Sequence, residues 1–490
     1  MNTISIHQNF KKYFIYAFLT KVMFFLFFAY LFNKGASKED NVNFIFTYSK
    51  DCASYIAPAI NFVDHGTCYE ESRGKKLFAH KMPGMVPIFV PLYYFFGLEW
   101  GLTFLVIIQI IIDALCCVLL AEIAYKIFNS QKAYLISFWL YTFSTIVSVS
   151  SHFAVSELLC TSFSIIAIYF ALVKKGLKHI VLAGLFSTWS VFFRPTSILL
   201  FLIIPLIILL KENVKLSWLN VKVKKNTLIL FFIPFIIFES LWIMRNHQIL
   251  NRFIPADIGQ ENFGNPAMKS LFSLILAMGG DLQSWNPNSE MRWFNSPSSV
   301  NYDLHFANSN PFPFYVLKNG ISLERLKKIR SIYFNYADIN LSAVKRNNLE
   351  KHIDLLCKQS ILDFKNKAPI YYYIISPLRN LKTFLFIKRP YGFSFRNNGF
   401  LEKSIRMWHF ACYYFVLIFF IMNLLFIYLI KNKMTLNILL LCVMHIFLYG
   451  FIFRYSENRY LVPIYPYFVI LATGNILYLF LNFKLKRLVV

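Results

Sequence analysis

The sequence predicts an all-α integral membrane protein, and three observations carry that prediction. Of its 490 residues, 57% are hydrophobic and 15% charged, whereas soluble chains average about 45–50% apolar and about 25% charged residues. Aromatic residues make up 19% of the chain, which excludes intrinsic disorder. Long apolar stretches alternate with short basic connections, a pattern typical of a multi-span membrane protein.

Each apolar stretch is expected to form a helix, because a span needs about 20 mainly apolar residues to cross the bilayer core. About ten transmembrane helices are expected, within a range of roughly eight to thirteen. They lie near 13–33, 101–127, 132–150, 153–173, 178–193, 195–210, 226–243, 407–430, 434–453 and 458–481. The segment 83–97 is apolar but short and rich in proline, so we expect a re-entrant or interfacial helix there.

The connections between the spans predict the orientation. If the N-terminus lies in the cytoplasm, every cytoplasmic connection is rich in lysine, as the positive-inside rule requires. These connections are 126–132, 174–179, 211–225, 431–433 and the C-terminal tail. We therefore expect a multi-pass protein of the cytoplasmic (inner) membrane with both termini inside and its active site on the periplasmic or external face.

Three domains follow from this topology. Residues 1–243 are expected to form a transmembrane module whose first external loop is 34–82, and 406–490 the C-terminal transmembrane helices. Residues 244–405 are expected to form a small, mostly helical extracytoplasmic domain, because apolar residues recur there at helical spacing. Those residues are Leu323, Leu326, Ile329 and Tyr333.

Charge and cysteine content narrow the possible ligands. The formal net charge of +26 suits anionic lipid headgroups or a phosphate-bearing ligand. Nucleic acid is not expected as a partner, because the basic residues form no compact basic domain. The eight cysteines include no C-x-x-C pair and no zinc-site spacing. Cys52 and Cys68 share one loop, and a disulfide between them is left open.

Polar residues that a solvated loop does not explain occur at the external ends of the spans. Ionisable residues at membrane depth are costly, so they tend to face the bundle interior and mark a substrate path. The candidates are Asp51, Tyr55, His80, Lys81, His152, Glu157, Arg194, Trp242, Arg245, Glu457 and Arg459. A cleft with carboxylates and several cations suits an anionic, lipid-linked substrate and acid–base chemistry.

A structural alternative stands beside most of these candidates. Arg245 and Arg459 can snorkel to the headgroups, and Arg459 can instead pair with Glu457. Asp51 can cap a helix, and a histidine such as His152 is more often structural than catalytic. Glu157 is different, because a lone carboxylate about one turn into an apolar helix needs a partner.

Several short motifs occur in a characteristic order along the chain. They are Asp51-x3-Tyr55, Lys81-Met82-Pro83-Gly84, Ser156-Glu157, Trp242-x2-Arg245-Asn246 and Glu457-x-Arg459-Tyr460 with Pro463 and Pro466. This series resembles the GT-C membrane glycosyltransferases, in particular the group that contains protein mannosyltransferases and the lipid A aminoarabinose transferase. Protein mannosyltransferases carry Asp-Glu in the first loop, whereas Cys52 follows Asp51 here. This departure argues against the protein-mannosylating branch and leaves the acceptor open.

The resemblance implies an inverting glycosyltransferase that moves a sugar from a polyprenyl-phosphate carrier to a lipid or glycan acceptor. By this resemblance the catalytic residues are Asp51 and Glu157. The donor phosphate is assigned to Arg245, Arg459, Arg194 and Lys81, and the acceptor or sugar to Tyr55, His80, His152, Trp242 and Glu457. The residues call for no cofactor or metal ion, although a divalent metal is compatible with the family. The remaining partners expected are membrane lipids.

Two other classes of protein stay open. A transporter or flippase for lipid-linked glycans predicts pseudo-symmetric halves with broken helices near mid-membrane. An O-antigen ligase or polymerase uses diphosphate-linked donors and places its main residues in one large late loop. Replacement of Asp51 separates these alternatives, since it should abolish transfer only in the GT-C enzyme.

Overall fold

The computed structural model is that of an all-α membrane protein, as the sequence predicts. It describes residues 4–35, 42–43, 46–47, 50–72, 75–211, 221–255, 266–282, 289–295, 311–337, 341–386, 399–427, 432–455 and 457–487. In these parts of the chain, six helices are long and apolar enough to cross a membrane. Two short antiparallel hairpins pair β1 (Val42–Asn43) with β2 (Phe46–Thr47) and β3 (Glu70–Ser72) with β4 (Lys75–Leu77).

The contacts divide the chain into two compact units that differ from the expected domains. Unit 1 comprises Met1–Gln260, Pro390–Met444 and Val462–Val490, and unit 2 comprises Glu261–Arg389 and His445–Leu461. The domain boundary expected at 244 falls inside a helix that continues to Leu250 and belongs to unit 1. Unit 2 also takes a short segment from the C-terminal third of the chain.

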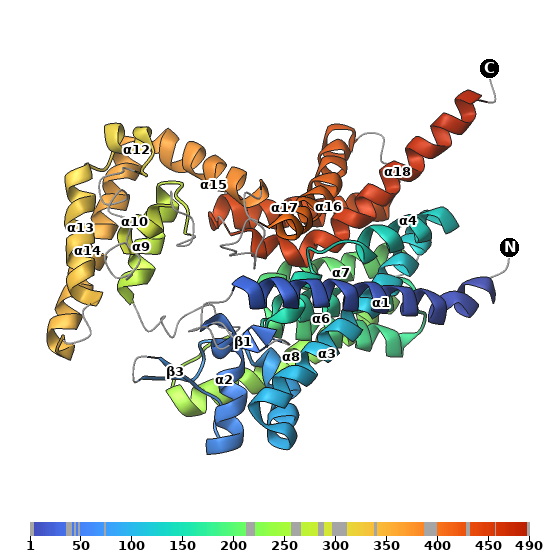
Figure 1. The fold of residues 1–490 in the computed structure, drawn as a ribbon, viewed down its shortest axis with the longest axis horizontal. Coiled ribbons are helices and arrows are strands. Elements are labelled where there is room, and N and C mark those ends of the chain that lie inside the picture. The colour runs from blue at the N-terminus through green and yellow to red at the C-terminus, as the bar shows by residue number, and fades with distance from the viewer. Residues whose placement is uncertain are drawn as a thin grey trace. The chain divides into compact units, whose positions relative to one another are not determined.

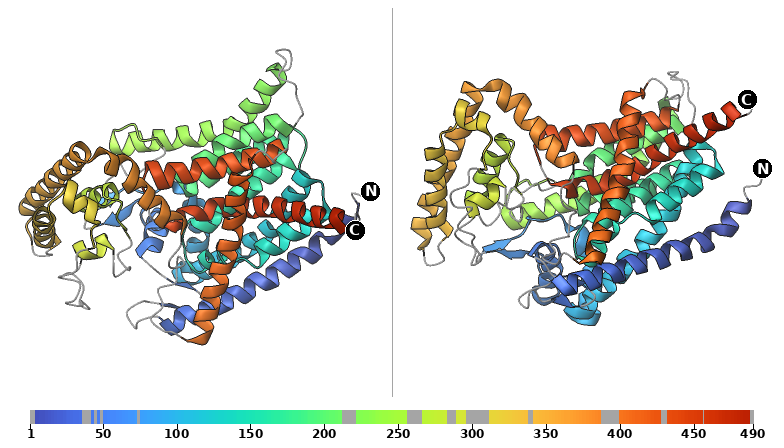
Figure 2. Two further views of the ribbon diagram at one scale, coloured as in Figure 1. Left: turned by 90° about the horizontal axis from the view of Figure 1, so that it is seen from above. Right: turned by 45° about the horizontal axis from the view of Figure 1, so that its top comes forward.

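Unit 1 is a helical bundle in which α5 packs on α6, α6 on α8, and α3 on α1, α4 and α5. The start of α1 and the end of α18 lie at one end of the bundle, and α2 and the two hairpins lie at the other end (Figures 1 and 2). Its helices are α1 (Ile4–Gly35), α2 (Lys50–His65), α3 (Val86–Phe128), α4 (Gln131–Thr142), α5 (Glu157–Leu172), α6 (Leu177–Phe193), α7 (Ile198–Lys211), α8 (Val221–Leu250), α16 (Phe400–Leu425), α17 (Lys433–Ile446) and α18 (Tyr465–Arg487), with 3₁₀ turns η1 (Pro83–Met85), η2 (Ser148–His152) and η3 (Pro195–Ser197).

The third expected span, 132–150, is wrong as a continuous helix. Helix α4 ends at Thr142, and the chain then runs without α-helix to Glu157, where α5 begins. Serine and threonine are frequent between 142 and 156, and their side chains compete with helical hydrogen bonding by binding nearby backbone groups. Ser151 does so, donating from Oγ to the carbonyl of Ser148 at 2.7 Å. The break therefore has a local cause in the sequence.

The segment 83–97 is separate from the span that follows it, as expected. Turn η1 leads into the first part of α3, and Gly97 interrupts that helix with φ 70° and ψ −173°. Glycine adopts this left-handed backbone without the steric cost of a Cβ. The short helix before Gly97 exposes Tyr94, Phe95 and Phe96, which suits a position at the membrane interface.

Unit 2 is a helical domain with its own apolar core. Leu326, Ile329 and Tyr333 are buried in that core and Leu323 packs against it, which confirms the helical periodicity predicted for this region. Its elements are α9 (Pro266–Ala277), α10 (Glu290–Asn295), α12 (Phe314–Asn319), α13 (Leu323–Ala337), α14 (Ala343–Lys367), the π-helix η6 (Tyr371–Ile375), α15 (Ser376–Leu385) and the π-helix η8 (Phe447–Ile452). The 3₁₀ turn η9 (Asn458–Ile464) replaces the start of the last expected span.

Candidate functional site

The first loop is organised around the carboxylate of Glu70 on β3. Ser54 of α2 donates a hydrogen bond to Glu70 Oε1 at 2.7 Å, and His80 Nδ1 donates to Oε2 at 2.5 Å. Burial raises the pKa of the Glu70 carboxyl, but these hydrogen bonds and the charges of His80 and Lys81 outweigh it, so the pKa lies below its ordinary value of 4.5. The ionised carboxylate joins the helix that carries Asp51 to the exit of the loop.

Lys81 is the cation that this arrangement leaves most available. Its Nζ lies 4.8 Å from the centroid of the Tyr55 ring, and the Lys81 side chain is half-buried. Tyr55 follows Asp51 by one turn of α2. Within the described part of the chain, Lys81 forms no salt bridge, although its charge acts on Glu70. A cation held over an aromatic ring keeps its hydrogen-bond donors for another partner.

Arg245 on α8 binds the backbone on both sides of the β3–β4 hairpin. Its guanidinium donates to the carbonyl of Phe78 at 2.5 Å and to the carbonyl of Cys68, and it lies 5.0 Å from the Trp242 ring. Cys68 and Cys52 are both free thiols, so the structure contains no disulfide between them. Arg245 thus binds two backbone carbonyls of the loop and the side-chain oxygen of its neighbour Asn246.

The loop exit packs closely against the end of α6. A Cβ on Gly84 would lie 2.6 Å from the backbone carbon of Phe192, so only glycine allows this approach. Trp189 Nε1 donates to the carbonyl of Gly84 at 3.2 Å, and Trp242 packs in a cluster with Met82 and Phe192. The packing brings the motif Lys81-Met82-Pro83-Gly84 beside Arg194, which directly follows α6.

Glu157 and Arg194 form a buried ion pair. A terminal nitrogen of Arg194 pairs with Glu157 Oε1, and the two side chains are 6% and 1% exposed, respectively. Glu157 is the first residue of α5, where the helix dipole favours a negative charge. Its second oxygen, Oε2, is buried with no hydrogen-bond partner among the described residues. Arg194 is therefore the partner that the isolated carboxylate required.

Most of the predicted site residues of unit 1 come together in one place. Five of them lie in or against the first loop: Tyr55, His80, Lys81, Trp242 and Arg245. The loop exit at Gly84 contacts the end of α6, and Arg194, the partner of Glu157, directly follows that helix.

The four remaining predicted residues have other partners or an undescribed side chain. His152 donates from Nε2 to the carbonyl of Phe25 on α1 at 2.7 Å, and its ring stacks on the Phe25 ring. Glu457 and Arg459 belong to unit 2 and pair with each other at 2.6 Å. Asp51 lies in the first turn of α2, and its side chain lies outside the described part of the structure.

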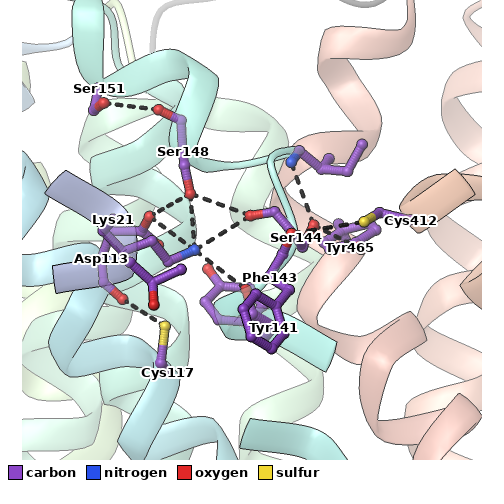
Figure 3. Close-up of polar contacts among 12 residues, drawn as sticks. Lys21, Asp113, Cys117, Tyr141, Phe143, Ser144, Ser148, Ser151, Cys412 and Tyr465 are labelled. Carbon is purple, nitrogen blue, oxygen red and sulfur yellow. Dashed lines mark hydrogen bonds and ion pairs between the residues drawn. The ribbon is translucent and has the colours of Figure 1, made fainter. Parts of the chain in front are cut away.

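Sequence reasoning missed two polar centres. One is Glu70, whose partners are distant in the sequence. The other is a buried network around Lys21 and Asp113, whose charged atoms are 3.2 Å apart (Figure 3). The signal for this network was present, because Lys21 is the one charged residue in the apolar stretch 13–33. The argument applied to Glu157 applies to it equally.

The described residues bring no three His, Cys, Asp or Glu side chains together in the way that a metal ion requires. Whether the protein uses a divalent metal is not decided by this observation, and the expectation that it needs none stays a prediction.

The fold and the site define a multi-span helical membrane protein with a polar cluster at the end of its bundle where the first loop lies. No family model and no curated protein matches the sequence. Among solved structures, ArnT from Cupriavidus metallidurans in the apo state is similar, with 15% identity and a TM-score of 0.37 over 94% of this chain and 76% of that chain. An oligosaccharyltransferase from Archaeoglobus fulgidus in the apo form has 13% identity and a TM-score of 0.42 over 98% of this chain and 52% of that chain.

A third similar structure is ArnT from Cupriavidus metallidurans bound to undecaprenyl phosphate. It has 13% identity and a TM-score of 0.34 over 88% of this chain and 73% of that chain. These proteins are of the class that the sequence motifs resemble. All of these TM-scores are below 0.5, so the likeness by itself assigns no function to this chain.

Proposed function

We propose that the protein is an inverting glycosyltransferase that moves a sugar from a polyprenyl-phosphate carrier to a lipid or glycan acceptor on the external face of the membrane. The observation that carries the proposal is the convergence described above. Four motif residues of the first loop and α8 lie together, and the loop exit packs against the end of α6, directly before the Arg194 that pairs with Glu157. Carboxylates and cations side by side at a membrane surface suit transfer from an anionic, lipid-linked donor.

The reaction requires two kinds of group. The acceptor hydroxyl attacks the anomeric carbon, the bond from that carbon to the phosphate oxygen breaks, and the electron pair leaves with the polyprenyl phosphate. The hydroxyl proton passes to a carboxylate, a step worth about 10²–10⁴-fold in rate. We assign this step to Asp51, which lies one turn before Ser54 and Tyr55 on α2. Cations stabilise the charge that develops on the departing phosphate.

The geometry changes the order of the phosphate-binding candidates. Arg245 is engaged by two backbone carbonyls, Arg194 by Glu157 and Arg459 by Glu457. Lys81, the last of the four by sequence, therefore becomes the first choice for the donor phosphate. Tyr55, which lies under its ammonium, is then placed to contact the sugar or the phosphate. A lysine acts as a compact point charge toward phosphate.

The proposal is tested with purified protein in liposomes and a radiolabelled polyprenyl-phosphate hexose. Wild type is compared with Asp51→Asn, and the readout is transfer of label from the donor to a membrane extract of the host. Asp64→Asn is the matched control, because Asp64 lies on the same helix and is exposed. We expect transfer by wild type and Asp64→Asn, and a loss of about 10²–10⁴-fold in Asp51→Asn.

Each other outcome has a definite meaning. If the folded wild type turns over no monophosphate donor, the glycosyltransferase proposal fails and a transporter or a ligase takes its place. If Asp51→Asn transfers label as well as wild type does, the enzyme class stands and Asp51 leaves the mechanism.

A further inference from the structure

The stretch between α4 and α5 is buried in the bundle although it is not an α-helix. Every residue from Ser144 to Ser156 is buried, and η2 is the one regular turn described within it. Backbone carbonyls in such a segment lack the partners that a helix provides, and no water is present in the bilayer core to replace them. The carbonyls of Thr145, Val147 and Ser150 accept from N–H groups within the segment, and the other carbonyls need side chains as partners.

Side chains of α1, α3 and α16 supply these partners, and that of α16 is Trp408, which donates from Nε1 to the carbonyl of Phe143 at 2.9 Å. Lys21 of α1 donates from Nζ to the carbonyls of Tyr141 at 3.2 Å and Ser144 at 3.3 Å, so it binds the backbone where α4 ends (Figure 3). Gln109 of α3 donates from Nε2 to the carbonyls of Ser151 at 3.4 Å and Phe153 at 3.2 Å. The path of the segment thus depends on α1 and α3 together with α16.

A charge pair makes this arrangement possible. Lys21 and Asp113 are 2% and 1% exposed, and Nζ lies 3.2 Å from Asp113 Oδ2. Ser148 of the segment lies between them: its hydroxyl accepts from Lys21 at 2.8 Å and donates to Asp113 Oδ2 at 2.7 Å. Apolar residues often replace a buried ion pair without loss of stability, so stability alone does not call for one here. An ammonium group, however, has several hydrogen-bond donors, and it can donate to the carbonyls that have no helical partner.

The same segment leads directly into the candidate site. It ends at Ser156, and the next residue, Glu157, begins α5 with its carboxylate against Arg194. Within the segment, His152 is also held against α1 by a hydrogen bond to the carbonyl of Phe25. A change in the path of the segment therefore moves the start of α5.

We propose that Lys21 and Asp113 are positioning residues for the transfer reaction. They hold the segment 143–156 in the one path that sets the Glu157 carboxylate beside Arg194. Neither residue touches the reacting atoms. This inference rests on the proposed glycosyltransferase function for its catalytic consequence, but not for its structural one.

The test uses the full chain in liposomes with the neutral double variant Lys21→Met/Asp113→Asn, which removes both charges together and leaves neither one unpaired. Lys12→Met is the matched control, because Lys12 lies on α1 and is exposed. Hydrogen exchange is measured by mass spectrometry over residues 143–156 and over the second half of α5. Turnover of a polyprenyl-phosphate hexose is measured per folded molecule, with kcat and donor KM determined separately.

We expect exchange over 143–156 to accelerate by about tenfold or more in the double variant, with exchange over the second half of α5 unchanged. We also expect kcat to fall by about tenfold or more while the donor KM stays constant, since a misplaced carboxylate slows the chemical step. Lys12→Met should match wild type in both measurements.

Exchange at the wild-type rate in the double variant would overturn the proposal, whether or not any donor is turned over. Faster exchange together with an unchanged kcat would overturn the catalytic link to Glu157. If the wild type turns over no donor but exchange accelerates in the double variant, the structural inference is supported and the proposed function alone fails.

Discussion

At the scale of single residues, the cations of the site differ in whether they already bind another group of the protein. Arg245 and Arg194 have partners within unit 1, whereas Lys81 lies over a tyrosine ring. The chain offers a close comparison in the same loop, since Lys76 Nζ lies 4.6 Å from the Tyr69 ring.

Lys81→Met is therefore expected to raise the donor KM by about tenfold to a hundredfold, because a hydrogen bond to a charged group contributes about 1.5–3 kcal/mol. Lys76→Met should leave the donor KM within about twofold of wild type, a change of less than about 0.5 kcal/mol. Initial rates over a range of donor concentrations in liposomes measure both. Equal effects of the two substitutions would remove Lys81 from the phosphate site.

The Glu157–Arg194 pair predicts a separation of stability from activity. Arg194→Met leaves a buried carboxylate unpaired and should lower the free energy of unfolding by about 3–5 kcal/mol. Glu157→Gln/Arg194→Met should recover most of that loss but not the transfer activity. Thermal unfolding in detergent and the liposome assay measure the two effects. Recovery of activity in the double variant would make the pair purely structural.

Glu70 predicts a dependence of stability on pH. Its pKa is lower in the folded protein than its ordinary value of 4.5, so its contribution to stability is fully present above about pH 4.5 and is lost as the pH falls through the folded pKa. The difference in unfolding midpoint between wild type and Glu70→Gln should therefore be constant near neutral pH and vanish in acid. The neighbouring exposed residue provides the control, Glu71→Gln, for which no such difference is expected. A difference that persists at pH 2 would contradict the assignment.

At the scale of elements, the site depends on one close contact between η1 and the end of α6. Gly84→Ala places a methyl group 2.6 Å from the Phe192 backbone, which must then move. Forced overpacking of this kind costs about 1–3 kcal/mol. We expect a lower unfolding midpoint and slower transfer, measured by thermal unfolding and the liposome assay.

Gly399→Ala is the matched control for that substitution, because a Cβ at Gly399 meets no atom within 4 Å and its φ of −66° suits any residue. It should leave stability and transfer at wild-type values. If Gly84→Ala behaves in the same way, the loop exit does not need the close approach to α6.

At the scale of the whole molecule, the first loop and the two chain ends lie at opposite ends of unit 1 (Figures 1 and 2). The positive-inside rule then predicts that the loop faces outward. In a background with Cys68→Ser, Lys76→Cys should react with a membrane-impermeant maleimide in intact cells, and Lys175→Cys should react only after the cells are broken. Lys76 and Lys175 are both exposed, so accessibility reports the side of the membrane. The reverse pattern would invert the topology.

The sequence by itself determined the class of fold and proposed the site residues. Apolar length, the basic connections and the spacing of Leu326, Ile329 and Tyr333 are local properties, so they can be read along the chain. Motif order identified Tyr55, Lys81, Trp242 and Arg245, and the structure brings these residues together around one loop.

Only the tertiary structure decided which charges are paired and where helices break. Arg194 satisfies Glu157 from 37 positions away in the chain, and Lys21 supports the unwound end of α4 from 120 positions away. A buried charge or carbonyl must have a partner within the protein, because there is no water in the bilayer core to bind it. Sequence spacing shows that a buried charge needs a partner, whereas the packing of the helices selects the residue that fills that role.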